Sequence, residues 1–431
     1  MSKENKNECI NVNIDSLSSE IDLSLRWFID HIDSIIISIG PLMWTLKESN
    51  KKISEDEKSF KDKYCTVLKK EKVEDYTIEK VNVPYHKHIE WKKLIRKSKG
   101  FSFSYKLIPQ SVFVSLVSIY DAYLGKLLKV LFFTKPEVLN TSERRFSFSE
   151  IASFYDINEA KQSIVNKEIE SVLRKNHAEQ LKYIENTFSI KISPNKELFN
   201  KFIELTERRN LFVHCDGVIS QQYIDACNNC GLKIDDKEIG KRLSVNSSYL
   251  KESYEILYEM AVQLTHVLWR KFYPNDLENA DINLMDITFD LLCIEKYTLA
   301  QKLLHFSCEK YIKHYDDMFN SIFIINKALS FHLDKNNAKC KEILSEYDWS
   351  AKADNFLLAY HVLNKDWKKA VTVMNNIGNQ EIWTTHYRDW PLFTKFRETK
   401  AFLNAYKKIY GKNFNDESAT EGWKSSASDD R

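Results

Sequence analysis

Residues 194–217 read PNKELFNKFIELTERRNLFVHCDG, and this stretch opens and closes like a single helix. Pro194 and Asn195 are typical of a helix start, because proline suits the first turn and asparagine can cap its free amides. Asp216 and Gly217 are typical of a helix stop, because glycine enters the left-handed conformation without steric cost. The segment therefore predicts one helix that ends close to His214.

The apolar faces of this helix continue onto polar side chains. Leu198, Phe202 and Leu205 form a stripe whose next position is Arg209, and a neighbouring stripe reaches Asn210. Burying such groups without partners costs about 2–7 kcal/mol. We therefore expect the guanidinium and the amide to be paired, to lie at an interface, or to line a polar pocket.

The spacing of these residues limits how one helix can use them. Asn210 and His214 are four residues apart and share a face. Arg209 is turned away from His214 by about 140°, given 3.6 residues per turn. We expect that a kink, or the same helix of a second copy of the chain, completes any site that uses all three.

The composition favours a helical protein. The 431 residues include only 9 glycines and 7 prolines, where average usage gives roughly 30 and 20. All-β sandwiches, glycine-rich nucleotide loops and collagen-like chains are therefore poor fits. Hydrophobic residues make up 43% and aromatic residues 13%, which supports packed cores and argues against general disorder. The predicted fold class is all-α.

Charge and motifs exclude several functions. The formal net charge is +2, from 63 basic and 61 acidic side chains, so attraction to nucleic acid or membrane must come from a local patch. GxxxxGK[ST], GxGxxG, HExxH and GxSxG are absent, which removes support for nucleotide-loop, zinc-protease and α/β-hydrolase chemistry. The polar N-terminus and the charged residues of the apolar windows predict a soluble, cytoplasmic protein without membrane spans.

The cysteines predict neither disulfides nor a metal centre. Eight cysteines are spread without a framework, which suits a reducing compartment. Cys227 and Cys230 form a CxxC pair, and His214 and Cys215 lie upstream, but no second pair matches it. We interpret these as ordinary loop cysteines and expect no metal and no cofactor.

Breaks in the pattern divide the chain into segments, and Tyr273-Pro274-Asn275-Asp276 is the strongest boundary. We predict a flexible lead over 1–18, a helical N-terminal extension over 19–109, a helical bundle over 110–275, a second helical domain over 276–411 and a disordered tail over 412–431.

The densest basic stretch lies at 86–106, HKHIEWKKLIRKSKGFSFSYK. Its cations alternate with aromatic side chains, a pattern that suits an electrostatic path for RNA. A solvated, lysine-rich connector has the same composition, and lysine runs are usually that. The candidate RNA-binding residues are Lys92, Lys93, Arg96 and Lys97, together with Arg208.

A strongly periodic helix follows this stretch. Apolar residues recur at spacings of three and four, which predicts one buried face, and Asp121 sits beside them. The residues of that face are Val112, Leu116, Ile119, Tyr120, Tyr123, Leu127 and Val130.

The C-terminal segment is a succession of short helices. Residues 357–374 form one helix-turn-helix hairpin with large residues on the first helix and Ala370 on the second. This resembles a degenerate tetratricopeptide-type repeat. An ordinary helical bundle remains the alternative, since only one such unit is found.

Arg209-Asn210-x3-His214 at a helix end, followed by a turn, resembles the HEPN superfamily of prokaryotic nucleases. The signature of that family is R-x(4–6)-H with a polar residue after the arginine. The helix around Asp121 resembles the first family helix, which often carries an acidic residue there. The resemblance covers about 110–270 and is similar to HEPN-like nucleases of restriction and abortive-infection systems.

A second Arg-x4-His match, Arg26 to His31, lacks the features that carry this resemblance. Trp27 follows its arginine, and the helix continues past its histidine. We treat it as a chance match.

The resemblance implies a metal-independent endoribonuclease of the toxin or phage-defence type. His214 would be the general acid/base, Arg209 would stabilise the phosphorane, Asn210 would hold the phosphate or orient His214, and Asp121 would support them. The implied partner is RNA, such as tRNA or mRNA. A homodimer through the HEPN-like domain and a protein regulator on the C-terminal helices are also implied.

Three other interpretations remain. The helices could be a catalytically inactive HEPN-type scaffold, or Arg209 and His214 could be a structural pair inside a bundle. A toxin restrained by a nucleotidyltransferase antitoxin is disfavoured, because the tyrosine it modifies would stand at Asp216.

Overall fold

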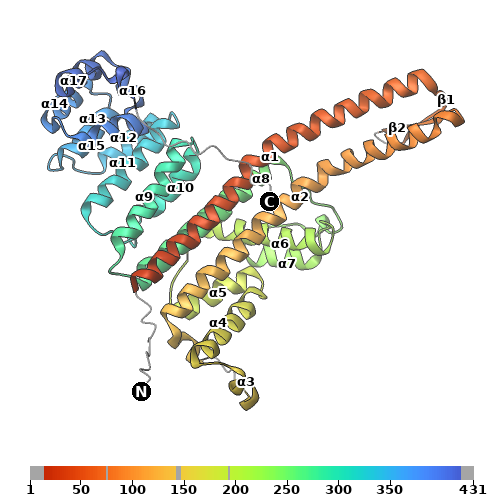
Figure 1. The fold of residues 1–431 in the computed structure, drawn as a ribbon, viewed down its shortest axis with the longest axis horizontal. Coiled ribbons are helices and arrows are strands. Elements are labelled where there is room, and N and C mark those ends of the chain that lie inside the picture. The colour runs from red at the N-terminus through yellow and green to blue at the C-terminus, as the bar shows by residue number, and fades with distance from the viewer. Residues whose placement is uncertain (1–13, 74–75, 142–146, 193–194, 419–431) are drawn as a thin grey trace, which may run out of the picture. The chain divides into compact units, whose positions relative to one another are not determined.

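The computed structural model describes residues 14–73, 76–141, 147–192 and 195–418, and the chain divides into two compact units, 1–272 and 273–431. Apart from one strand pair, the regular structure of both units is helical, which confirms the all-α class (Figure 1). The first unit contains α1 (Ile14–Tyr64), β1 (Thr66–Val73), β2 (Tyr76–Asn82), α2 (His88–Thr134), α3 (Phe148–Ser153), α4 (Ile157–Leu173), α5 (His177–Phe188), α6 (Lys196–His214), α7 (Gln221–Asn229) and α8 (Ser247–Phe272).

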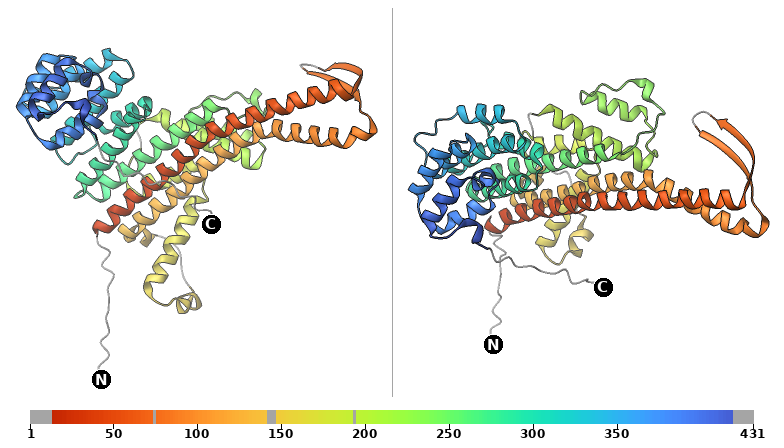
Figure 2. Two further views of the ribbon diagram at one scale, coloured as in Figure 1. Left: turned by 45° about the horizontal axis from the view of Figure 1, so that its top comes forward. Right: turned by 90° about the horizontal axis from the view of Figure 1, so that it is seen from above.

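The two longest helices of the first unit, α1 and α2, pack against each other as an antiparallel pair. Their outer halves extend beyond the other helices of that unit, and the β1–β2 hairpin joins their tips (Figure 2). We call these outer halves and the hairpin, residues 35–105, the arm. The strands pair antiparallel with a register shift between Val67 and Lys69.

The arm corrects three sequence-based expectations. A helical extension was expected over 19–109, but β1 and β2 within it are two paired strands. The predicted boundary between 109 and 110 falls inside α2, which continues through Pro109. Residues 14–18, assigned to a flexible lead, belong to α1, while residues 1–13 lie outside the described part.

The core of the first unit forms where α2 meets α1 and α8. Leu116, Tyr120, Tyr123 and Leu127 of α2 have no exposed surface, and Phe28 of α1 packs its ring against both tyrosines. Each fully buried side chain of this size contributes about 1.5–3 kcal/mol. The predicted face is therefore largely correct, although Val112 and Ile119 are only half-buried.

The helix α6 begins and ends as its sequence indicates. The Asn195 side chain accepts hydrogen bonds from the amides of Glu197 and Leu198, at 3.1 and 3.2 Å. At the other end Gly217 has φ +76°, and its amide donates to the carbonyl of Leu211. A Cβ at Gly217 would lie 2.7 Å from the Phe212 ring. These contacts fix the end of α6 at His214.

The second unit contains α9 (Leu277–Cys293), α10 (Tyr297–Ser307), α11 (Asp317–Leu333), α12 (Asn337–Ser345), α13 (Asp354–Leu363), α14 (Trp367–Ile377), α15 (Glu381–Asp389), α16 (Thr394–Arg397) and α17 (Lys400–Tyr410). The predicted hairpin at 357–374 corresponds to α13 and α14, which pack together. The predicted tail begins too early, since Phe414 packs its ring against Phe402 and Tyr406. Residues 419–431 lie outside the described part.

Three hairpins of this unit share one turn, which the sequence pattern did not reveal. The pairs α9–α10, α11–α12 and α13–α14 each turn at a residue with positive φ: Glu295 at 61°, Lys335 at 64° and Lys365 at 59°. The amide of the next residue then donates to a carbonyl five residues earlier, as in a Schellman cap.

The residue five positions after each turn is small and buried: Ala300, Cys340 and Ala370. A small side chain there lets the two helices of a hairpin approach closely. The second unit is thus built from repeated helical hairpins. None of the described helices of either unit has an apolar stretch long enough to cross a membrane.

Candidate functional site

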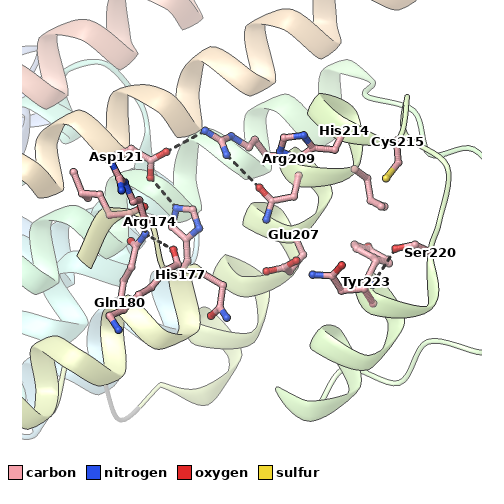
Figure 3. A pocket seen from close by; sticks show the side chains of 16 residues that line it. Asp121, Arg174, His177, Gln180, Glu207, Arg209, His214, Cys215, Ser220 and Tyr223 are labelled. Carbon is pink, nitrogen blue, oxygen red and sulfur yellow. Dashed lines mark hydrogen bonds and ion pairs between the residues drawn. The ribbon is translucent and has the colours of Figure 1, made fainter. Parts of the chain in front are cut away.

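A pocket of about 400 Å³ lies in the first unit beside the C-terminal half of α6 (Figure 3). Its other walls come from the end of α4, the start of α5, the start of α7 and Asp121 of α2. Its volume falls within the range of about 300–1,000 Å³ that is usual for small-ligand sites. Arg209, Asn210 and His214 all line it.

Asp121 joins two cationic or potentially cationic side chains at one wall. One carboxylate oxygen lies 2.8 Å from Nε2 of His177, and the other accepts a hydrogen bond from Nη2 of Arg209 at 3.3 Å. An ionised carboxylate only accepts, so Nε2 of His177 carries a proton. The His177 side chain is 6% exposed and the Asp121 side chain 26%. His177 is therefore buried in the helical bundle and holds Asp121, which is partly exposed at the pocket wall.

The Arg209 guanidinium is held by two neighbours, and the arginine side chain is 24% exposed. Its Nη1 donates to Oδ1 of Asn210 at 3.2 Å, in addition to the Asp121 contact. Its Nε is buried and has no hydrogen-bond partner within the described part of the chain. Guanidinium groups bind phosphate through paired N–H donors, and here Nη1 and Nη2 each make one hydrogen bond and keep a second N–H for a ligand.

His214 is the last residue of α6 and is exposed. Among the described residues no hydrogen bond holds its ring, so both ring nitrogens are available to a ligand or to water. Figure 3 shows His214 and Arg209 among the side chains that line the pocket. We expected that a kink or a second copy would be needed to unite Arg209, Asn210 and His214. That expectation was wrong, because the long arginine side chain turns toward Asn210 and Asp121 within one chain.

Arg208 lies in a different environment from its neighbour. Its Nε donates to Oε1 of Glu204 at 2.7 Å, and its guanidinium stacks 3.9 Å from the ring centre of Tyr249. Tyr223 and Tyr249 also donate to Glu204. Burial, followed by the Glu204 charge, raises the pKa of both tyrosines, which keeps them protonated donors. Arg208 does not line the pocket, so the structure separates it from the other candidate residues.

The basic residues of the arm also lie away from the pocket. Lys92, Lys93, Arg96 and Lys97 are exposed, and the last three border a shallow groove with Phe101. Trp91 is not free to stack on a base, because it already stacks on Phe60 at 5.4 Å. At 1.5 Å per residue, Lys97 stands about 36 Å along the helix from Asp121. The arm is therefore a separate surface.

Two pocket residues were missed by the sequence analysis. His177 could not be found, since it reaches Asp121 from 56 positions away along the chain. Glu207 could have been found, because it precedes Asn210 by three residues and His214 by seven, and these spacings share a helix face. Glu207 is 9% exposed and lines the pocket.

The remaining candidates concern metal and thiols. Among the described residues no group of three or more His, Cys, Asp or Glu side chains is arranged to hold a metal ion. Cys227 of the CxxC pair is buried, and burial raises its pKa to about 12. Cys215, in contrast, is exposed and lines the pocket.

The second Arg-x4-His match has no comparable setting. Nε of Arg26 donates to Asp22 at 2.7 Å, and Nδ1 of His31 lies 2.6 Å from the carbonyl of Trp27. Both contacts stay within α1. Arg26 borders a groove that His31 does not line.

Comparisons with protein-family models, with curated proteins and with solved structures found no match to this chain.

Proposed function

We propose that this protein is a metal-independent endoribonuclease of the HEPN type, acting as a toxin or phage-defence effector. One observation carries the proposal: Arg209, Asn210 and His214 line a single pocket in which an acidic residue orients the arginine. The HEPN-like bundle would correspond to the helices of the first unit, and the hairpins of the second unit would be a tetratricopeptide-like module.

The side chains in the pocket match the needs of RNA cleavage without a metal. The 2′-hydroxyl attacks its own phosphate and the 5′-oxygen leaves, so one group must move protons near neutral pH, and histidine suits this. His214 performs that transfer. The phosphorane that forms carries two negative charges, which the Arg209 guanidinium stabilises through its fork of N–H donors. Asn210 holds the arginine through its Oδ1 and has its amide donors left for the phosphate.

Asp121 is a positioning residue in this mechanism. It touches Arg209 and His177, which fixes the guanidinium before substrate binds. Pre-arranged charges lower a barrier more than mobile ones, since no reorganisation is needed during the reaction. His177 in turn holds the second carboxylate oxygen.

The substrate is RNA, such as tRNA or mRNA, and the arm extends its binding surface. Lys92, Lys93, Arg96 and Lys97 are exposed cations that attract the backbone over a long path. The protein acts in the cytoplasm as a homodimer through the first unit, and the hairpins of the second unit receive a regulator.

The experiment that tests the proposal is an RNA digest in EDTA with analysis of the product ends. We expect cleavage to persist, because no step needs a metal, and the 5′ fragments to end in a 2′,3′-cyclic phosphate or a 3′-phosphate. A substrate with a single 2′-deoxy nucleotide at the cleaved position should resist cleavage. Loss of activity in EDTA, or cleavage of the deoxy substrate at the same bond, would refute this mechanism.

A further inference from the structure

Glu207 is a largely buried residue whose carboxylate has no hydrogen-bond or ion-pair partner in the described part of the chain. It is 9% exposed and lines the pocket beside α6, where Figure 3 labels it. Within the described part of the chain it makes no hydrogen bond and no ion pair. The guanidinium groups of the pocket are engaged elsewhere, Arg209 by Asp121 and Arg174 by Glu170. Lys175 also lines the pocket, and its ammonium makes no ion pair with Glu207 within the described residues.

An unpaired carboxylate in such a place indicates a ligand that donates hydrogen bonds. A charge on so poorly exposed a residue is normally paired in proteins, whereas the oxygens of Glu207 are left to the solvent of the pocket. A phosphate cannot fill this role, since it would add a second negative charge. The group that meets Glu207 must therefore be neutral or cationic and must present N–H or O–H donors.

Among the four bases of RNA, guanine fits this requirement best. Its Watson–Crick edge presents two adjacent donors, N1–H and the N2 amino group, which match the two oxygens of one carboxylate. Adenine and cytosine each place one amino donor beside an acceptor, and uracil places its single donor between two acceptors. Proteins read unstacked RNA bases through this edge.

The spacing along α6 separates base recognition from the chemistry. Glu207, Asn210 and His214 lie on one face, and seven residues of helix rise about 10.5 Å. A general base that acted with His214 would have to reach the 2′-hydroxyl, which attacks the phosphorus atom from the side opposite the leaving 5′-oxygen. A carboxylate two turns away is better placed to meet the base of the nucleotide whose phosphate lies at Arg209 and His214.

We propose that Glu207 makes the enzyme select guanine at the nucleotide that occupies this pocket. This inference rests on the proposed function for its biological meaning, but its physical content is a binding preference. It identifies the substrate class as RNA with an unpaired guanosine next to the cleaved bond.

The first test uses oligoribonucleotides that differ only at one unpaired position, which carries guanine, inosine, adenine, cytosine or uracil. A good bidentate contact discriminates by about tenfold or more. We expect the wild-type protein to cleave the guanine substrate faster than the adenine, cytosine and uracil substrates by that factor. The inosine substrate should be cleaved at an intermediate rate, because its base lacks the N2 amine. E207Q should lose the preference for guanine. The control is E197Q, the same change on α6 at an exposed position outside the pocket.

The second test needs no catalysis and separates the two proposals. It titrates 3′-GMP and 3′-AMP into H214A and into the double variant H214A/E207Q, and measures both dissociation constants. Preference for 3′-GMP that E207Q abolishes supports the inference, even if the wild-type protein cuts no RNA and the nuclease proposal fails. Equal binding of the two nucleotides overturns it. Equal loss of cleavage on every base in E207Q also overturns it, because that result is expected of a general base.

Discussion

Two segments of the first unit carry the same Arg-x4-His spacing, and only one of them forms a candidate site. In α1, Arg26 and His31 contact residues of their own helix, Asp22 and Trp27. In α6, Arg209 contacts Asp121 of α2, and the helix ends at His214, whose ring is exposed beside a pocket.

The difference between these segments lies in what surrounds them. Both histidines are exposed, and both arginines have an acidic partner. The α1 partner is four residues away, on the same helix, whereas the α6 partner comes from a distant part of the chain and is also held by His177. A pocket needs walls from several elements, so a motif becomes a site only where the fold supplies them. Each of the following predictions changes one segment and uses the other, or a similar position, as its control.

Replacing the histidine of each segment by alanine should give the largest difference in cleavage rate between the two segments. His214→Ala removes the proposed proton-transfer group, and general acid–base catalysis contributes about 10²–10⁴-fold. We expect the cleavage rate in EDTA to fall by that factor, while His31→Ala leaves it unchanged. Single-turnover rates on one RNA measure both. If His214→Ala and His31→Ala cleaved RNA at comparable rates, the proposal that only the α6 segment takes part in cleavage would be contradicted.

Replacing the acidic partners should give a smaller contrast. Asp121→Asn keeps the shape but removes the charge that holds Arg209 and His177, so the guanidinium is less well oriented. We expect kcat to fall by about tenfold with little change in KM, since positioning acts mainly on the transition state. Asp22→Asn, on Arg26, should not change kcat. Thermal unfolding of both variants checks that each remains folded, and an unchanged kcat in Asp121→Asn contradicts a positioning role.

RNA should protect one cysteine from alkylation. Cys215 lines the pocket and is exposed, so bound RNA should slow its reaction with iodoacetamide several-fold in the inactive His214→Ala variant. Cys293 is exposed in the second unit and serves as the control that RNA does not protect. Cys227 should stay unlabelled at pH 8 in both conditions, because its pKa near 12 keeps it a thiol. Mass spectrometry of the labelled peptides measures all three, and equal labelling of Cys215 with and without RNA would place the RNA elsewhere.

The helix stop after His214 should affect stability more than chemistry. Gly217→Ala forces a side chain into φ +76° and toward the Phe212 ring at 2.7 Å. We expect the free energy of unfolding to fall by about 2 kcal/mol. Gly240→Ala has φ +80° but meets nothing within 4 Å, so it should lose about 1 kcal/mol. Urea denaturation compares the two, and an equal loss would show that the Phe212 contact does not matter.

The sequence predicted the local features of the fold and site but not those that depend on distant contacts. The start of α6 at Asn195, its end at Gly217 and the buried face of α2 follow from capping chemistry and helical period, which act within a few residues. Arg209 occupies the next position of an apolar stripe on α6, and this position predicted that its guanidinium would be paired or would line a polar pocket. Its partnership with Asp121 was only an analogy to family helices, and His177 carried no local signal at all.

The remaining errors have similar physical causes. Residues 66–82 are too charged to show a buried strand pattern, because a two-stranded arm has little core to face. The three hairpin turns of the second unit escaped notice because Glu295, Lys335 and Lys365 take a conformation usually marked by glycine. The continuity of α2 through Pro109 depends on its packing against α1.

The central claim, that the Arg-x4-His segment of α6 cuts RNA and that of α1 does not, has one direct test. RNA would be incubated in EDTA with the wild-type protein and with the double variants Arg26→Ala/His31→Ala and Arg209→Ala/His214→Ala. We predict that the wild-type protein and the α1 double variant release fragments with 2′,3′-cyclic phosphate ends at the same rate, while the α6 double variant releases none. Cleavage by the α6 double variant at the wild-type rate would contradict the account.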